Sequence, residues 1–354
     1  EDTWTSLPGL TRPRIGAVAA VLDGTLLVAG GALDGIQQPT RLVEATPLAG
    51  AWVRFPSAPA ELGEVAAGIL GHHLYLVGQG AQATQRLDLR TLRWDPPGSV
   101  PARPVDGHHH AAEVVHGRWY LLGGLGGAGG QVQVYDPVTS AWTRGADMPF
   151  AAGSSASAVI GGMIYVAGGI IGEHTTAEAA RYDPATDTWT PIAPMPWPRN
   201  HAASTTDGAR LWVFGGRGPG SGDANVVANG YAEVQVYDPA EDRWITSEDP
   251  GSTLPRLPQA RGGMGKAVYL GGKFWILGGE TLDGPGATPE RVYTRVDVFD
   301  PATGPWGAGT AMPVPRHGIF PLAWAGRILV AAGGVKAARS GSAVFDALLP
   351  DPPE

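Results

Sequence analysis

The sequence has 354 residues, of which 25 are basic and 33 acidic, and its net charge is −8 with histidine neutral. This balance argues against a nucleic-acid or anionic-membrane surface, because both require clustered Lys and Arg. Cysteine is absent, which excludes disulfides, thiolate metal sites and a cysteine nucleophile, and no apolar run reaches the ~20 residues that span a bilayer.

Short apolar runs that lead into a glycine pair, or a near-pair, recur along the whole chain. Each run has four or five residues, is rich in β-branched and aromatic types, and is bounded by glycines. Such runs predict strands that are buried on both faces and are too short to be helices. In chain order they are 26–31, 74–80, 119–124, 164–169, 211–216, 274–279 and 329–334.

A tryptophan follows each of the first six runs, 14 to 28 residues after the glycines. The seventh run ends at Gly333–Gly334 and has no tryptophan after it, whereas Trp4 has no run before it. Seven runs match seven tryptophans only if the chain is read as a circle. We therefore expect the strand around Trp4 to complete the last sheet and to close the ring. The six tryptophans that follow the runs are Trp52, Trp94, Trp142, Trp189, Trp244 and Trp306.

Each repeat unit predicts four antiparallel strands. A small apolar strand such as 155–160 is followed by a glycine-bearing tight turn, which suits a two-residue hairpin, and then by the apolar run. The third and fourth strands flank an Asp-Pro phrase, which favours a turn because Pro presets φ and the Asp side chain caps nearby amides. The phrase therefore predicts a hairpin, whose Tyr and Trp would fill the space between adjacent sheets. It occurs as VYDPVTSAW at 134–142 and in related forms at 181–189, 236–244 and 298–306.

The double glycine, the Tyr a few residues before the Trp, and the Trp itself resemble the kelch repeat over nearly the whole chain. The resemblance implies an all-β fold: a single seven-bladed kelch-type β-propeller over 1–354, with four antiparallel strands in each blade. Three units depart from the pattern: the first has EATPL where Tyr-Asp-Pro is expected, the second has RLDLR and a split Gly-Gln-Gly, and the last ends in VFDAL. The predicted blades lie at about 14–56, 63–97, 105–145, 153–192, 199–247, 261–308, and 316–347 together with 1–8.

Arginines and histidines open the innermost strands on the face that carries the longer loops, 217–233 and 280–291. Such a ring around a channel mouth is typical of an anion- or carboxylate-binding site, and Asp106 and Glu64 could balance its charge. The alternative is structural, since an Arg at this place belongs to the kelch pattern and can tie blades together through carbonyls and Asp side chains. The candidate ligand-binding residues are Arg14, His108, His110, Arg199, His201, Arg217, Arg261, Arg316 and His317.

We expect neither a metal nor a cofactor. On a strand, His108 and His110 would point to one side and His109 to the other. Two imidazoles need a third ligand, and the spacing assigns none, although His201 is the nearest suggestion. Known catalytic motifs are absent from the sequence.

The leading hypothesis is a non-catalytic module that presents a ring of loops to a protein, peptide or glycan. The alternatives are a carbohydrate-active enzyme of mutarotase or epimerase type, which needs only an acid and a base around a sugar, and a structural part of a cell-envelope assembly. Arg outnumbers Lys by 22 to 3, which suggests a GC-rich bacterial genome. We expect an extracytoplasmic protein, secreted or periplasmic, and otherwise a cytoplasmic one. The sequence does not say whether a leader or another domain precedes Glu1.

Overall fold

The computed structural model describes residues 50–79, 81–219, 230–282 and 291–350, and the backbone of five short strands within 14–47. Nearly all regular structure in these residues is β-strand. The described part of the chain holds no helix with the length and apolarity needed to cross a bilayer.

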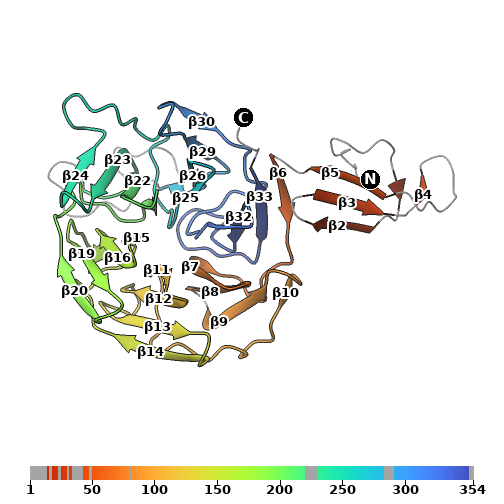
Figure 1. The fold of residues 1–354 in the computed structure, drawn as a ribbon, viewed down its shortest axis with the longest axis horizontal. Coiled ribbons are helices and arrows are strands. Elements are labelled where there is room, and N and C mark those ends of the chain that lie inside the picture. Colours follow the sequence, from red (N-terminus) through yellow and green to blue (C-terminus); the bar gives the residue numbers. More distant parts are fainter. Residues whose placement is uncertain are drawn as a thin grey trace.

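In the described residues, six four-stranded antiparallel sheets surround a central axis (Figure 1). We number the sheets one to six in chain order and name the strands of each from the axis outward. Sheet one contains β7 (Gly63–Leu70), β8 (His73–Gln79), β9 (Ala81–Asp88) and β10 (Arg93–Trp94). Sheet two contains β11 (Ala111–Val115), β12 (Arg118–Leu122), β13 (Val132–Asp136) and β14 (Ala141–Gly145). Sheet three contains β15 (Ala156–Ile160), β16 (Met163–Ala167), β19 (Ala179–Asp183) and β20 (Thr188–Pro191). Sheet four contains β21 (Ala203–Thr206), β22 (Leu211–Arg217), β23 (Gly230–Asp238) and β24 (Arg243–Thr246). Sheet five contains β25 (Val268–Leu270), β26 (Lys273–Leu277), β29 (Val296–Phe299) and β30 (Trp306–Ala308). Sheet six contains β31 (Leu322–Trp324), β32 (Arg327–Ala331), β33 (Phe345–Leu349) and, outermost, β6 (Ala51–Arg54).

The first strands of neighbouring sheets contact one another around the axis, and β31 of sheet six contacts β7 of sheet one. Small residues occupy these strands because the strands converge near the axis, where larger side chains would not fit. Gly68 on β7 illustrates the limit, since a Cβ there would lie 2.6 Å from the ring of the fully buried Trp119. The small buried residues of the first strands include Ala66, Ala67, Ala111, Ala112, Ala156, Ala158 and Ala203.

The repeated Asp-Pro phrase forms the hairpin between the third and fourth strands, as predicted. In sheet two, Tyr135 pairs with Trp142 across β13 and β14, and Asp136 accepts a hydrogen bond from the Val138 amide at 2.8 Å. The aromatic pairing repeats in sheet three (Tyr182 with Trp189), sheet four (Tyr237 with Trp244) and sheet five (Phe299 with Trp306).

The tryptophan of the fourth strand also links most of the sheets to the sheet before them. In five sheets its indole Nε1 donates to a carbonyl in the segment that follows the preceding sheet's fourth strand. Trp52 obeys this rule as a member of sheet six, because it donates to Thr310 after β30. The five donor–acceptor pairs, all at 2.8–2.9 Å, are Trp52–Thr310, Trp94–Pro56, Trp142–Pro101, Trp189–Ala146 and Trp244–Ala193.

The prediction of seven blades is therefore wrong by one. The prediction that the strand around Trp4 completes the last sheet is also wrong. The last sheet is completed by β6, which pairs with β33 through Trp52 and Leu348. The segment around Trp4 lies outside the described residues. Within 14–47, β2 (Val18–Leu22), β3 (Thr25–Ala29) and β5 (Val43–Pro47) make a separate three-stranded sheet, and β1 (Arg14–Ile15) pairs with β4 (Ala32–Leu33). In Figure 1 the three-stranded sheet lies to one side of the ring.

The departure in the first unit supplies the physical reason. In sheets one to five the Asp of this turn accepts a hydrogen bond from a following amide. The first unit has Thr46 at that place, and in the described residues β5 does not pair with the strand that carries Trp52. That strand is free to join another sheet edge, and β33 accepts it. The Arg54 guanidinium then lies 2.5 Å from the carboxylate of Asp346 on β33, which adds an ion pair to the strand pairing. Counting repeats cannot distinguish these two positions, because a strand has the same sequence whichever edge it joins.

Replacing Trp244 with Phe should lower the free energy of unfolding by about 0.5–1.5 kcal/mol more than replacing Trp306 with Phe, because only the former breaks a hydrogen bond. Trp244 donates to the Ala193 carbonyl at 2.8 Å, whereas no described residue accepts a hydrogen bond from the buried Trp306 Nε1. Urea unfolding of the two single variants measures the difference. Equal losses would mean that the indole bond contributes nothing beyond packing.

Candidate functional site

The entrance of each first strand places one residue beside the channel, and all six of these residues have a left-handed backbone. Their φ angles run from 45° to 70°, a region that costs a residue other than glycine about 1–3 kcal/mol and that clusters at functional sites. We call them the rim positions and the face on which they lie the loop face, because the connections between sheets also lie there. In sheet order the rim positions are Glu64, His109, Ser154, His201, Gly263 and Gly318.

Backbone hydrogen bonds link successive sheets at the rim, which explains how the strained conformation is maintained. The Ser154 amide donates to His109, and the His201 amide donates to Ser154. On the other side of the channel, the Gly318 amide donates to Gly263 at 2.7 Å. The Val65 amide, next to Glu64, donates to Gly318 at 2.9 Å and so joins sheet one to sheet six.

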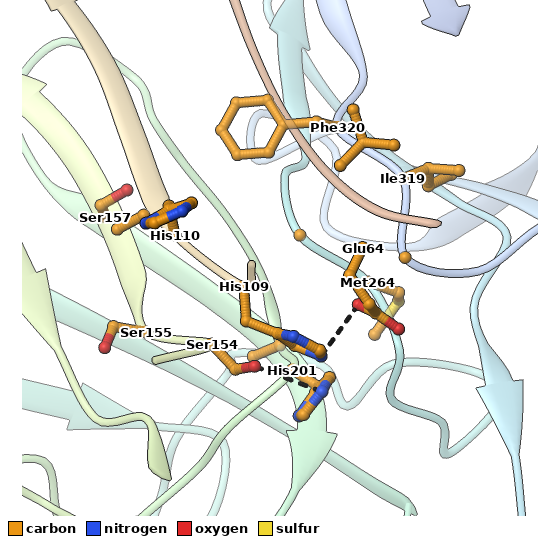
Figure 2. A pocket seen from close by; sticks show the side chains of 15 residues that line it. Glu64, His109, His110, Ser154, Ser155, Ser157, His201, Met264, Ile319 and Phe320 are labelled. Carbon is orange, nitrogen blue, oxygen red and sulfur yellow. Dashed lines mark hydrogen bonds and ion pairs between the residues drawn. The ribbon is translucent and has the colours of Figure 1, made fainter. Parts of the chain in front are cut away.

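The rim side chains converge on a cavity of about 30 Å³ at the channel mouth. Figure 2 shows Glu64, His109, Ser154 and His201 turned toward one another, with the Glu64 carboxylate above the two imidazoles. The glycine of sheet six makes this possible, since a Cβ on Gly318 would lie 2.9 Å from the Glu64 carboxyl carbon. The ring of equivalent positions is thus filled unequally, with side chains on one side and space for them on the other.

The two rim imidazoles present the same nitrogen to the cavity. His109 Nε2 lies 3.1 Å from Glu64 Oε2, while its Nδ1 contacts His108. His201 Nε2 lies 3.2 Å from Ser154 Oγ, while its Nδ1 lies 2.5 Å from Asn200 Oδ1. The two rings meet edge to face, with centroids 4.9 Å apart. Each ring is therefore oriented by a group outside the cavity.

The protonation states follow from burial and from neighbouring charges. Burial lowers the pKa of His109 to about 4 against the opposing charge of Glu64. Burial, and then the charge of Arg217, lowers the pKa of His201 well below its ordinary value. Burial would raise the pKa of Glu64, but the imidazoles of His109, His317 and His201 outweigh it and hold that pKa well below the usual range. At neutral pH the cavity therefore holds an ionised carboxylate beside neutral imidazoles.

A second charged group adjoins the cavity. His317 Nδ1 lies 3.6 Å from Glu64 Oε1 and 3.2 Å from Glu280 Oε1, and the Arg217 guanidinium pairs with the same Glu280 carboxylate. Burial acts to lower the pKa of His317, but the carboxylates of Glu64 and Glu280 outweigh burial and raise it. Glu280 begins β27 (Glu280–Thr281), which pairs with β28 (Arg291–Val292). His317 and Arg217, both predicted from the sequence, thus lie beside the cavity.

A lysine spans the channel on the inner side of the cavity. Lys266, from sheet five, donates to the Ser157 carbonyl of sheet three at 2.6 Å and pairs with the Glu113 carboxylate of sheet two. Ser157 Oγ donates to the same carboxylate at 2.7 Å, and Ser157 also lines the cavity. The cavity is therefore a pocket with a charged floor rather than an open pore.

Three of the predicted arginines contact their own sheets, as the structural alternative proposed. Arg199 Nη2 lies 2.9 Å from Glu233, Arg261 Nη1 lies 2.9 Å from Asp297, and Arg316 Nη2 lies 2.7 Å from Asp346. All three side chains are almost completely buried. Their charges are compensated within the blade, and the residue two positions after each arginine occupies the rim.

The three consecutive histidines do not alternate as on a strand. His109 and His110 both line the cavity, but His110 engages both ring nitrogens within its own sheet, 2.6 Å from Arg103 Nη1 and 2.6 Å from the Gly123 carbonyl. The reason is the left-handed φ of 59° at His109, which lies before β11 begins and breaks the period of two. His108 is half-buried beside His109.

The remaining predicted positions are only partly described. Arg14 lies on β1, for which only the backbone is described. Most of the two long loops predicted to contact a ligand, 220–229 and 283–290, lies outside the described residues.

Sequence reasoning did not select His109, Ser154 and Glu280. A signal for the first two is present, because aligning the units on their glycine pairs places His109, Ser154 and His201 each two residues before a first strand. Glu280 directly follows the glycine pair Gly278–Gly279, where the isolated bridge to Gly262 brings it to the channel.

Protonation of Glu233 should destabilise the fold in acid. Burial would raise the pKa of Glu233, but Arg199 and Arg256 lower it. A carboxyl with a depressed folded-state pKa stabilises the protein fully above its unfolded value of about 4.3 and loses that contribution as the pH falls through the folded value. Glu233→Gln should therefore be less stable than the parent at pH 7, with a gap that closes below about pH 4. Urea unfolding across pH measures it, and a constant gap would contradict the assignment.

Comparison with known proteins agrees with this architecture. The Kelch motif matches residues 107–149 and 152–196. The chain is 28% identical to Kelch-like protein terF of Aspergillus terreus, over 94% of this chain and 73% of that protein. It is 25% identical to Kelch-like protein 15 of Danio rerio, over 86% of this chain and 44% of that protein. The solved structure of YjhT superimposes with a TM-score of 0.68 at 18% identity, covering 82% of this chain and 95% of that one.

Proposed function

We propose that this chain, a kelch-repeat β-propeller, is a protein-binding module that holds a peptide segment of its partner on the loop face. Kelch-like proteins are generally protein-interaction modules. The observation that carries the proposal for this chain is Trp197, which lies on the loop face with 44% of its surface exposed. Tryptophan is among the residues that most often dominate the energy of protein interfaces.

Trp197 is held rigidly, which suits it to anchor a partner. It lies between Pro196 and Pro198 in the connection from β20 to β21, which ends at the rim residue His201. Prolines restrict the backbone on both sides of the tryptophan. The Gln235 side chain clamps its peptide groups, accepting from the Trp197 amide at 3.0 Å and donating to the Trp197 carbonyl at 2.9 Å. Little conformational entropy is then lost on binding.

Peptide phage display on the immobilised chain tests the proposal. We expect enriched peptides whose affinity falls more than about tenfold for Trp197→Ala, the loss typical of an interface hot spot. Val138→Ala is the matched control, because Val138 is also an exposed apolar residue, at 91%, but lies in a hairpin on the opposite face. No enrichment, or binding that depends on Val138 and not on Trp197, would contradict the proposal.

A glycan partner or a mutarotase activity is the second candidate, favoured by the pairing of Glu64 with His109. A carboxylate 3.1 Å from an imidazole offers a base and a potential acid, which is all that anomerisation of a sugar requires. NMR of sugar anomers with the parent and with Glu64→Gln decides this. Exchange no faster with the parent than without protein would exclude the activity.

The extracytoplasmic location stays a prediction, which cell fractionation would test.

A further inference from the structure

We propose that Glu64, His109 and His201 bind one divalent transition-metal ion, such as Zn²⁺, at the mouth of the channel. One donor atom from each residue lies within 4.8 Å of the other two. Two imidazole nitrogens and one carboxylate oxygen form a ligand set that holds zinc in three-ligand sites and leaves a fourth position open. The residues belong to sheets one, two and four, so the propeller, and not a local motif, brings them together.

The orientation of the two imidazoles supports this proposal. In metal sites, a ligating histidine usually engages its second nitrogen with an outer partner, which fixes the ring. His201 meets this condition, because Asn200 Oδ1 lies 2.5 Å from its Nδ1 and Asn200 Nδ2 in turn donates to Thr175 Oγ1 at 2.7 Å. His109 meets it through the contact of its Nδ1 with His108. Both Nε2 atoms are left for the cavity.

The size of the cavity favours an ion over a larger ligand. A space of about 30 Å³ encloses an ion and a water molecule, whereas a sugar would have to reach Glu64 and His109 from outside the cavity. Zinc–ligand distances of about 2.0–2.2 Å require the three donors to move inward, which rotations of the Glu64 and imidazole side chains can provide. Ser154 Oγ, 3.2 Å from His201 Nε2, is placed to hydrogen-bond a water molecule on the open position.

Titration of the purified full chain with ZnCl₂, after treatment with a chelator, tests the site by calorimetry. We expect one ion per chain. Glu64→Gln and His201→Ala should each weaken binding by more than the ~10–100-fold that loss of an outer partner costs, and Asn200→Ala should fall within that range. Glu64→Gln keeps the size of the side chain, so it separates ligand loss from misfolding. Urea unfolding of each variant checks that the fold is retained.

A second cluster, His72, His73 and Asp88, provides the control, since its donor atoms are equally close but lie at a half-exposed hairpin. His72→Ala should leave zinc affinity unchanged. Co²⁺ gives an independent readout, because visible absorption of the bound ion should appear with the parent and disappear with His201→Ala. Zinc binding that survives Glu64→Gln and His201→Ala, or is lost with His72→Ala, would overturn the proposal. The peptide-binding proposal is tested separately, because it rests on Trp197 and we expect enriched peptides to bind the metal-free chain as well.

Discussion

Arg261→Met is expected to lower the free energy of unfolding by about 3–5 kcal/mol, the cost of removing one partner from a buried ion pair. Arg261 and Asp297 are both completely buried, and their charged atoms lie 2.9 Å apart. The guanidinium also donates to the Gly278 carbonyl at 2.6 Å and to the Gln259 carbonyl at 3.1 Å. Methionine fills similar volume but leaves the two carbonyls without these donors and the buried carboxylate with Arg295, which is 41% exposed, as its remaining cationic partner. Equilibrium urea unfolding measures the loss.

Arg295→Met is the matched control for this pair. Arg295 contacts the same Asp297 carboxylate at 2.6 Å, but its side chain is 41% exposed, so solvent screens the interaction and we expect a loss of about 1 kcal/mol or less. If Arg261 acted instead by binding a ligand, Arg261→Met would leave the unfolding midpoint unchanged and weaken only peptide affinity. The two roles are therefore separated by one pair of measurements.

For the arginines that precede the first strands, Arg199, Arg261 and Arg316, the sequence predicts the location but not the role. Their place at the start of the first strands follows from the repeat, and both a ligand-binding and a structural role are consistent with it. The choice depends on the partners, and Glu233, Asp297 and Asp346 on the third strands are 30 or more residues away in the chain. Nothing in a single sequence states that these carboxylates face the arginines.

The number of sheets could not be predicted, because it depends on which edge one strand joins. The hairpins followed directly from local chemistry, since the turn residues lie between the strands they connect. The strand with Trp52 has no such phrase before it, and its partner β33 lies almost 300 residues away. A count of repeats therefore gave the architecture and was wrong by one sheet.

The residues that line the candidate site could not all be predicted, because their orientation depends on backbone geometry that residue types do not encode. A left-handed φ is expected at glycine, and two of the six rim positions are glycines. At His109 the φ of 59° accompanies the links between sheets, and His109 lines the cavity together with His110, although strand alternation would place the two on opposite sides. The place of the rim in the fold therefore follows from the repeat, whereas the entry of His109 into the cavity depends on its backbone conformation.

Lys266→Met is expected to lower the free energy of unfolding by about 3 kcal/mol, because it leaves the Glu113 carboxylate without its cationic partner inside the channel. Both side chains are nearly buried, and the lysine joins sheet five to sheets two and three. The loss should be at the lower end of the usual range for a buried pair, since the Ser157 hydroxyl still donates to the carboxylate at 2.7 Å. Urea unfolding measures this change as well.

The double variant Lys266→Met, Glu113→Gln distinguishes two effects of losing Lys266: the uncompensated charge of Glu113, and the loss of the hydrogen bond to the Ser157 carbonyl that connects opposite sheets. Neutralising both partners removes the uncompensated charge, so the double variant should recover most of the stability that the single variant loses. Lys273→Met is the surface control, because Lys273 is 40% exposed and lies 3.9 Å from Asp300, and it should change stability by less than about 1 kcal/mol. If the double variant is as unstable as Lys266→Met, the lysine acts mainly by bridging opposite sheets through the Ser157 carbonyl. The contact of Lys266 with Glu113 would then be incidental to stability.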